Sequence, residues 1–490
     1  MIARIPCSRA FGSGTPWSVA SQVATMAMAE ATGINVPCVL AWNKHHDPTQ
    51  NPVRSPYILM EDIKGTLLDH PLPDDDSERS RAIMKLSDKV VEDMINQMVP
   101  AFSQLGSIYF EEDFPSSRPL LAPDQEVPEE MRPVMEKLRI GPMAEMIWWR
   151  PFHDEPHLDR GPWDTLEECI GAAVLIERRA VERHRADPSS LAYTRSNLKD
   201  LNIVERLLDK VDALAPHMQG AIEKASAFPR RIMQNVFVHP EIWARNVLVP
   251  ARTPENAVEG MLRPVMIDWE HTAVLPYALQ FYQPGLMIWE SWLPKRNETG
   301  DWTFVKESNV PEDGPWPDYD NMGPEIREVN NANMLPEFRR LIFFLILRAC
   351  ADGPTRLWWT LAEIKKKWDK DEDIYGPCPI PFEPGEMEEA QRAMEEVDDY
   401  EDLLESLAIS LGVGVDGYVA KQEYYEHLLP DLEDAKKNWE KDAPGRPFPF
   451  HEGGWAPFFI EQFPAFPSLS NTNNFHYILL FKFLIGNNVP

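Results

Sequence analysis

The chain has 490 residues, of which 43% are apolar and 16 are tryptophan, and its formal net charge is −30. This composition is that of a packed globular protein, and the length favours two lobes or domains over a single core. The acidic excess argues against nucleic acid or an anionic membrane surface as the main partner, although it also fits plain solubility.

The five cysteines are widely spaced and form no CxxC pair, so the sequence predicts neither a disulfide framework nor a zinc site and favours a reducing, intracellular compartment. They are Cys7, Cys38, Cys169, Cys350 and Cys378. No apolar run approaches the ~20 residues of a membrane-spanning helix. The opening residues Met1–Pro6 resemble the interior of a strand rather than a targeting peptide, so we expect the natural start to lie upstream.

Three short apolar runs near the N-terminus, bounded by Pro or Asn, predict the strands of a small sheet. They are Ile2–Ile5, Val36–Trp42 and Tyr57–Met60. Between the first two, Val19–Ala31 has apolar residues at helical spacing, which predicts a helix that ends before Gly33. Residues 1–65 are therefore expected to form a β-lobe.

After Gly65 the pattern becomes helical. Charged and apolar residues at 3.6-residue spacing predict helices at Ser77–Tyr109 (interrupted at Pro100), Asp164–Arg185, Arg195–Ala227 (interrupted at Pro216), Glu337–Lys367 (broken at Gly353 and Pro354) and Met387–Leu411. Three triplets rich in β-branched residues predict a small sheet among the helices: Val236–Val238, Val247–Val249 and Val265–Ile267. We expect an α+β fold with a helical lobe over residues 66–442 and an irregular tail over 443–490.

A polar motif lies among those triplets. His239 and Glu241 are followed, after four intervening residues, by Asn246, and the last triplet leads into Asp268. In the kinase signature H-R-D-x-x-x-x-N the first carboxylate orients the attacking hydroxyl, and the Asn and a later strand-end Asp hold Mg²⁺. Each residue alone is more simply a loop cap. Together and in this order, they favour a phosphotransferase.

The chain resembles the fungal branch of the aminoglycoside-phosphotransferase-like, protein-kinase-like proteins, which includes the altered-inheritance-of-mitochondria proteins. The segments that carry the resemblance are Ile2–Pro6, Ser21–Met26, Ser55–Glu61 with Gly65, Ile140–Pro142, Asp159–Trp163, Ile267–His271 and Val274–Pro276. The similarity extends well from Met1 to about Gln280 and thinly to about Pro447.

The resemblance implies a two-lobed kinase-like fold with a truncated N-terminal lobe, which binds Mg-ATP between its lobes and transfers phosphate to a small-molecule hydroxyl. The site residues that it implies are His239 and Glu241 in catalysis, Arg4, Gln22, Met60, Glu61 and Ile63 at the nucleotide, and Asn246 and Asp268 at the metal. It also implies a mitochondrial location, with the cytoplasm as the alternative. The phosphate acceptor does not follow from the fold.

Three departures from the family pattern predict impaired catalysis. No glycine-rich hairpin precedes Met1 to cover the nucleotide's phosphates. Gln22 stands where similar proteins carry Glu, so Arg4 is expected to lose the ion pair that positions it. Glu241 replaces the catalytic Asp, and its extra methylene displaces the carboxylate by roughly 1 Å, which costs on the order of a hundredfold in rate. A pseudokinase acting as an interaction protein and a truncated inactive product therefore stay open as alternatives.

Overall fold

The computed structural model describes residues 1–6, 12–67, 101–123, 125, 127–155, 157–193, 196–226, 229–239, 241, 244–250, 264–280, 290–296, 302–308, 337–338, 341, 345–412, 422–444 and 448–449. They fall into two compact units. The first unit holds the described residues from 1 to 280 and from 337 to 384, and the second holds those from 290 to 308 and from 385 to 449. Most of the predicted helix over residues 77–109, and all but a few residues of the predicted tail, lie outside the described residues.

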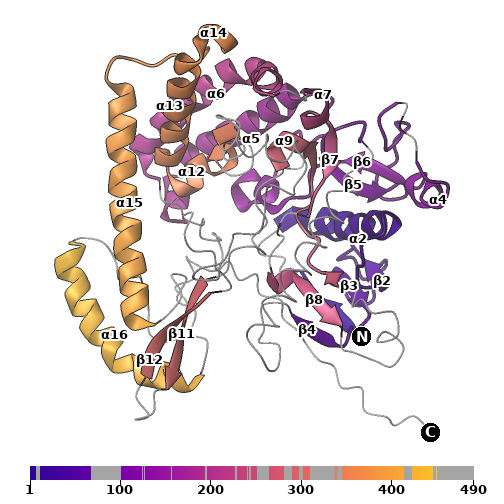
Figure 1. The fold of residues 1–490 in the computed structure, drawn as a ribbon, viewed down its shortest axis with the longest axis horizontal. Helices are drawn as coiled ribbons and strands as arrows, with labels where there is room; N and C mark the ends of the chain where they lie inside the picture. The colour runs from indigo at the N-terminus through magenta and orange to yellow at the C-terminus, as the bar shows by residue number, and fades with distance from the viewer. Residues whose placement is uncertain are drawn as a thin grey trace. The chain divides into compact units, whose positions relative to one another are not determined.

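The predicted N-terminal sheet is confirmed. Strands β1 (Ile2–Arg4), β3 (Tyr57–Met60) and β2 (Val39–Asn43) form an antiparallel sheet in that order. Helix α2 (Thr15–Ala31) lies beside this sheet (Figure 1) and packs Val19 and Val23 against it. The helix begins four residues before the predicted start, because a proline suits the first turn of a helix.

A β-hairpin replaces the end of a predicted helix. Strand β5 (Ser107–Phe110) pairs antiparallel with β6 (Leu138–Gly141), and the short helix α4 (Arg132–Met135) lies between them in the sequence. The prediction of a helix through Tyr109 was wrong, because three consecutive buried residues fit a strand covered on both faces as well as a helix.

Two long helices form the largest packed pair of the first unit, and Figure 1 shows them side by side. Helix α5 (Leu166–Ala186) begins with a capping box made by Thr165 and Glu168. Helix α6 (Leu198–Lys224) was predicted to break at Pro216 but continues through it. A proline removes only one backbone hydrogen bond, and the buried apolar side of α6 holds the helix together on both sides of it.

The strands around the polar motif belong to two ladders rather than to the single sheet that we predicted. Strand β7 (Asn235–Phe237) pairs with β10 (Val274–Pro276), whereas β8 (Val247–Pro250) lies between β4 (Gly65–Leu67) and β9 (Val265–Met266). A Cβ atom on Gly65 would lie 2.3 Å from the Val249 carbonyl oxygen. The close β4–β8 pairing therefore requires glycine at the start of β4.

The predicted break at Gly353 and Pro354 is confirmed: α12 (Ala349–Asp352) ends before it and the longer helix α13 (Thr355–Lys370) begins after it. Short helices complete the described part of the first unit. They are η1 (Gly12–Gly14), η2 (Met146–Trp149), η3 (Pro151–His153), η4 (Pro188–Tyr193), α7 (Pro229–Ile232), η5 (Ala244–Asn246), α9 (Tyr277–Gln280), η9 (Ile346–Arg348) and α14 (Glu372–Tyr375).

The second unit contains a hairpin of β11 (Glu290–Arg296) and β12 (Trp302–Ser308) and two helices, α15 (Glu386–Leu411) and α16 (Gln422–Asp442). Leucines of the two helices form its described core. The prediction of a helix to Leu411 is confirmed. None of the described helices in either unit is both long enough and apolar enough to cross a membrane.

Candidate functional site

The ring of His239 joins the loop of the polar motif to the strand that leads to Asp268. Its Nε2 lies 2.9 Å from the Ile267 carbonyl oxygen, and its Nδ1 accepts the Glu241 amide hydrogen at 3.1 Å. Burial lowers the pKa of His239, so the ring is neutral and carries its one proton on Nε2. Trp269 packs edge-on against the ring at 4.7 Å. His239 therefore has a structural role that fixes the spacing of two segments.

Asn246 is held by hydrogen bonds of its side-chain nitrogen and its backbone carbonyl, and no described residue donates to its side-chain oxygen. The side-chain Nδ2 donates to the Glu241 carbonyl oxygen at 3.0 Å, and the Asn246 carbonyl accepts from the Ile267 amide at 3.0 Å. Only 4% of Asn246 is exposed. The amide oxygen is the group that a hard cation would use.

The carboxylate of Glu241 points to a neighbour within its own loop. Arg245 Nη2 lies 3.0 Å from Glu241 Oε2, and both side chains are about one quarter exposed or less. This pair keeps the carboxylate ordered. It also holds the Glu241 carboxylate away from the orientation in which it could accept a proton from a substrate hydroxyl.

Asp268 lies in the left-handed backbone region, with φ of 68°. Non-glycine residues in this region are uncommon and tend to occur at functional sites. Its Oδ1 is 2.8 Å from Arg4 Nη1, and Glu270 Oε2 is 2.6 Å from Arg4 Nη2. Burial acts to lower the pKa of Arg4, but the two carboxylates raise it overall above its usual value.

Gln22 does not take part in this group. It is buried on α2, and no hydrogen bond joins it to Arg4 among the residues that the structure describes. The lost helix ion pair was expected to leave Arg4 loosely held. Glu270 instead supplies a carboxylate from the segment after β9, so the fork of Arg4 is engaged at both ends.

His271 extends the charged group toward η2. Its φ is 65°, and its Nε2 lies 3.4 Å from Glu270 Oε1. Burial acts to lower the pKa of His271, but Glu270, Glu145 and Asp268 outweigh it and raise the value to about 9. The Met146 amide nitrogen lies 3.4 Å from Nδ1, and a protonated ring cannot accept its hydrogen. The attraction between the charged ring and the carboxylates outweighs the loss of that long contact. Burial raises the pKa of Glu145.

The predicted adenine-binding segment continues directly from the sheet that carries Arg4. Met60 is paired with Ile2 in the β1–β3 register. Glu61 donates its amide to the Cys38 carbonyl at 3.0 Å and accepts the Cys38 amide on its carboxylate at 2.9 Å. Ile63 makes no hydrogen bond with any described residue, so its backbone groups are available to a ligand.

The donor set suits a magnesium ion that is bound mainly by its substrate. Asn246 and Asp268 both offer oxygen ligands, and Mg²⁺ in phosphoryl-transfer sites takes one or two protein ligands with phosphates and waters. Asp268 Oδ1 is buried and receives no well-directed hydrogen bond, although Arg4 lies 2.8 Å away. The described residues contain no group of three or more His, Cys, Asp or Glu that could hold a metal without a substrate.

The structure therefore brings Arg4 to Asp268, His239 to the Asp268 strand, and Glu241 to Asn246. Sequence reasoning named Glu270 and His271 only as part of a motif and missed their contacts. Their signal was the run of three ionisable or aromatic residues directly after Asp268.

The chain is similar to several fungal proteins named altered inheritance of mitochondria protein 9, mitochondrial. The one from Lachancea thermotolerans is 27% identical over 303 residues, which are 57% of this chain and 45% of the relative. The one from Yarrowia lipolytica is 32% identical over 275 residues, 53% of this chain and 43% of the relative. The one from Clavispora lusitaniae is 26% identical over 298 residues, 58% and 46% respectively.

The chain thus spans about half the length of the curated relatives that it matches. No family model matches the sequence. No solved structure matches it significantly. The similarity supports a relationship to these proteins and leaves the activity to be argued from the site.

Proposed function

We propose that the protein is a kinase-like phosphotransferase of two lobes that binds Mg-ATP and transfers phosphate to a small-molecule hydroxyl. The observation that carries this proposal is the loop held by His239. In this loop the Asn246 side-chain amide donates to the Glu241 carbonyl, and the Asn246 backbone carbonyl accepts from the Ile267 amide, next to Asp268. That arrangement supports two oxygen ligands at the positions where a phosphotransferase holds its metal.

In this proposal Asn246 and Asp268 hold the magnesium, which supplies charge neutralisation for the phosphate oxygens. Arg4 provides a fixed cation whose planar fork suits phosphate. The contact between Arg4 and Asp268 is one that a bound nucleotide would rearrange, since Arg4 must then share its charge with phosphate. Ile63 offers unbonded backbone groups for the adenine edge.

A second candidate is a pseudokinase that keeps the site and acts as an interaction protein. Two observations favour it: Arg4 is held by both Asp268 and Glu270, and the Glu241 carboxylate is paired with Arg245. Both contacts oppose catalysis without opposing the fold. The names of the relatives favour a mitochondrial location for either candidate.

The test is calorimetric titration of Mg-ATP into the wild type and into Asp268→Asn. Asparagine tolerates the left-handed backbone at this position, so the substitution removes the charge without adding strain. We expect binding by the wild type and its loss in Asp268→Asn. Asp373→Asn is the matched control, because Asp373 is exposed on α14 and has no described partner.

Equal heats for wild type and Asp268→Asn would contradict the metal assignment. No heat for the wild type would contradict nucleotide binding and favour the interaction protein. Binding of Mg-ATP without turnover would favour the pseudokinase over the enzyme.

A further inference from the structure

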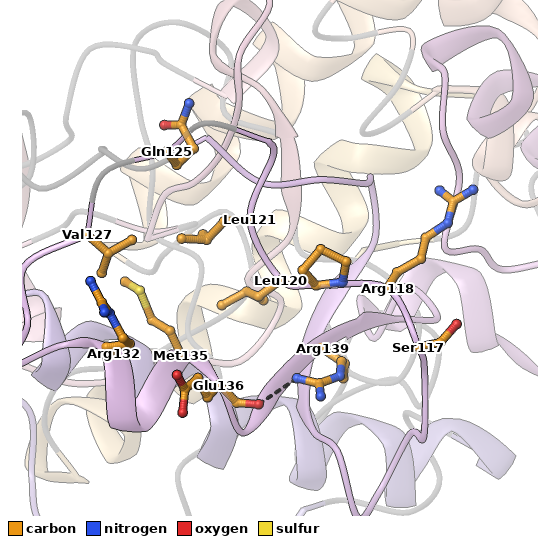
Figure 2. Close-up of a pocket in the computed structure, with 11 residues that line it drawn as sticks. Ser117, Arg118, Leu120, Leu121, Gln125, Val127, Arg132, Met135, Glu136 and Arg139 are labelled. Carbon is orange, nitrogen blue, oxygen red and sulfur yellow. Dashed lines mark hydrogen bonds between the residues drawn. The ribbon is translucent and has the colours of Figure 1, made fainter.

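A pocket of about 810 Å³ lies along the loop that follows β5 and along α4 (Figure 2). Its volume is within the range of small-molecule sites. The lining residues are Ser117, Arg118, Pro119, Leu120, Leu121, Gln125, Val127, Arg132, Met135, Glu136 and Arg139. None of them belongs to the candidate site, so the pocket is separate from the residues of the proposed phosphotransferase.

The middle of the pocket is apolar. Leu120 is 3% exposed and Met135 is 5% exposed, and Leu121 and Val127 are half-buried beside them. Figure 2 shows Leu120 and Leu121 between Arg118 on one side and Arg132 on the other. An apolar ligand group placed here would be removed from water, and that burial favours binding.

Two of the three arginines of the pocket are already paired. Arg118 binds the Asp164 carboxylate with both Nη atoms, one of them at 3.0 Å. Arg139 Nη2 lies 3.0 Å from Glu111 Oε1, and its other nitrogens donate to backbone carbonyl oxygens, including that of Glu136. These contacts make the two arginines rigid parts of the wall.

Arg132 is different. It is exposed at the start of α4, and its side chain forms no hydrogen bond or ion pair with any described residue. Its guanidinium offers a planar fork that matches a carboxylate in two parallel hydrogen bonds. Glu136, one helical turn away in the same lining, disfavours a ligand with two negative charges.

We infer that this pocket binds an organic monocarboxylate with an apolar body, whose carboxylate pairs with Arg132 while the body covers Leu120, Leu121 and Met135. The single available fork sets the charge of the ligand at one. The apolar middle sets the nature of the rest of the molecule.

The test is calorimetric titration of decanoate into the full chain and into Arg132→Gln. We expect decanoate to bind the wild type and to bind Arg132→Gln at least about tenfold more weakly, as for the loss of a charge-assisted hydrogen bond. Arg132→Lys keeps the charge but not the fork, so an intermediate affinity is expected. Arg206→Gln is the matched control, an exposed arginine on α6 without a described partner, and should bind decanoate like the wild type.

Two further ligands separate the parts of the inference. Acetate has the charge without the body, and decyltrimethylammonium has the body with the opposite charge, so both should bind much more weakly than decanoate. The inference is overturned if the wild type does not bind decanoate, if Arg132→Gln binds it equally well, or if either of these two ligands matches it. Unchanged circular dichroism of Arg132→Gln would show that the variant is folded.

Discussion

Arg4 joins two carboxylates that follow the same short strand. Asp268 and Glu270 are separated by one residue, and both carboxylates contact the fork from a segment in which Asp268 has a positive φ. Glu270 thereby holds the arginine in place of a helix glutamate. A short segment after β9 thus sets both the metal-ligand geometry and the position of the cation.

The position of the Glu241 carboxylate is testable by shortening its side chain. If ATP turnover is limited by that carboxylate, Glu241→Asp should raise it by up to about a hundredfold. Adding Gln22→Glu should raise it less, because Arg4 already has Glu270 as a partner. Turnover is measured as released ADP, with the exposed Glu167→Asp as control. An unchanged rate would show that the carboxylate position does not limit turnover.

The ring of His271 predicts a pH-dependent contribution to stability. Its pKa in the folded chain is about 9, above the ordinary value of 6.5, so the folded state holds the proton more tightly. The contribution is therefore fully present below pH 6.5 and is lost as the pH rises to about 9, and it is on the order of 3 kcal/mol.

His271→Asn removes the titration and tolerates the positive φ. The difference in unfolding free energy between the wild type and this variant, measured by urea denaturation, should shrink across that pH interval. A difference that stays constant with pH would contradict a charged His271.

At the scale of elements, Pro216 removes one backbone hydrogen bond from α6, and a substitution can restore it. It is exposed, so Pro216→Ala leaves no cavity, and the new amide hydrogen can bond to the carbonyl one turn earlier. We expect a gain of about 1–3 kcal/mol in unfolding free energy, seen as a higher melting temperature. His217→Ala, the exposed neighbouring position, is the control. No gain would mean that the helix is already distorted to suit the proline.

The local pattern of the sequence was enough to predict most of the individual helices and strands. Strands β1, β2 and β3, the end of α2, and the break before α13 follow from apolar spacing and from glycine or proline. The β4–β8 pairing and the separation of β7 from β8 did not, because strand partners far apart in sequence leave no trace in a local window. The hairpin of β5 was missed for a related reason: a strand buried on both faces lacks the alternation that marks a half-buried one.

The order of the site residues could be predicted from the sequence, but the ion pairs between them could not. His239, Asn246 and Asp268 carry a recognisable spacing. The pairing of Arg4 with Glu270, and of Glu241 with Arg245, depends on which side chains the tertiary fold brings within about 4 Å. Neither the left-handed backbone of Asp268 nor that of His271 has a sequence signal, since both are non-glycine residues.

For the whole molecule, the net charge of −30 implies repulsion in the folded state. Raising NaCl from about 10 to about 200 mM should therefore raise the melting temperature, because salt screens exposed like charges. The shift should be smaller near pH 5, about where carboxylates begin to be neutralised. A melting temperature that falls with salt would show that attractive ion pairs, such as those of Arg178 and Arg185, contribute more than the repulsion.

The ladder in which β8 lies between β4 and β9 also has a consequence for synthesis of the chain. Asn35, which accepts the Met266 amide at 2.9 Å, also donates to the Pro264 carbonyl, 229 residues further on. A ribosome releases the N-terminal strands first, so β4 has an open edge until β8 emerges, and such long-range closure is slow. During translation β4 therefore stays without its partner strand until β8 has been made, and this is the stage at which a chaperone would be most useful to this protein.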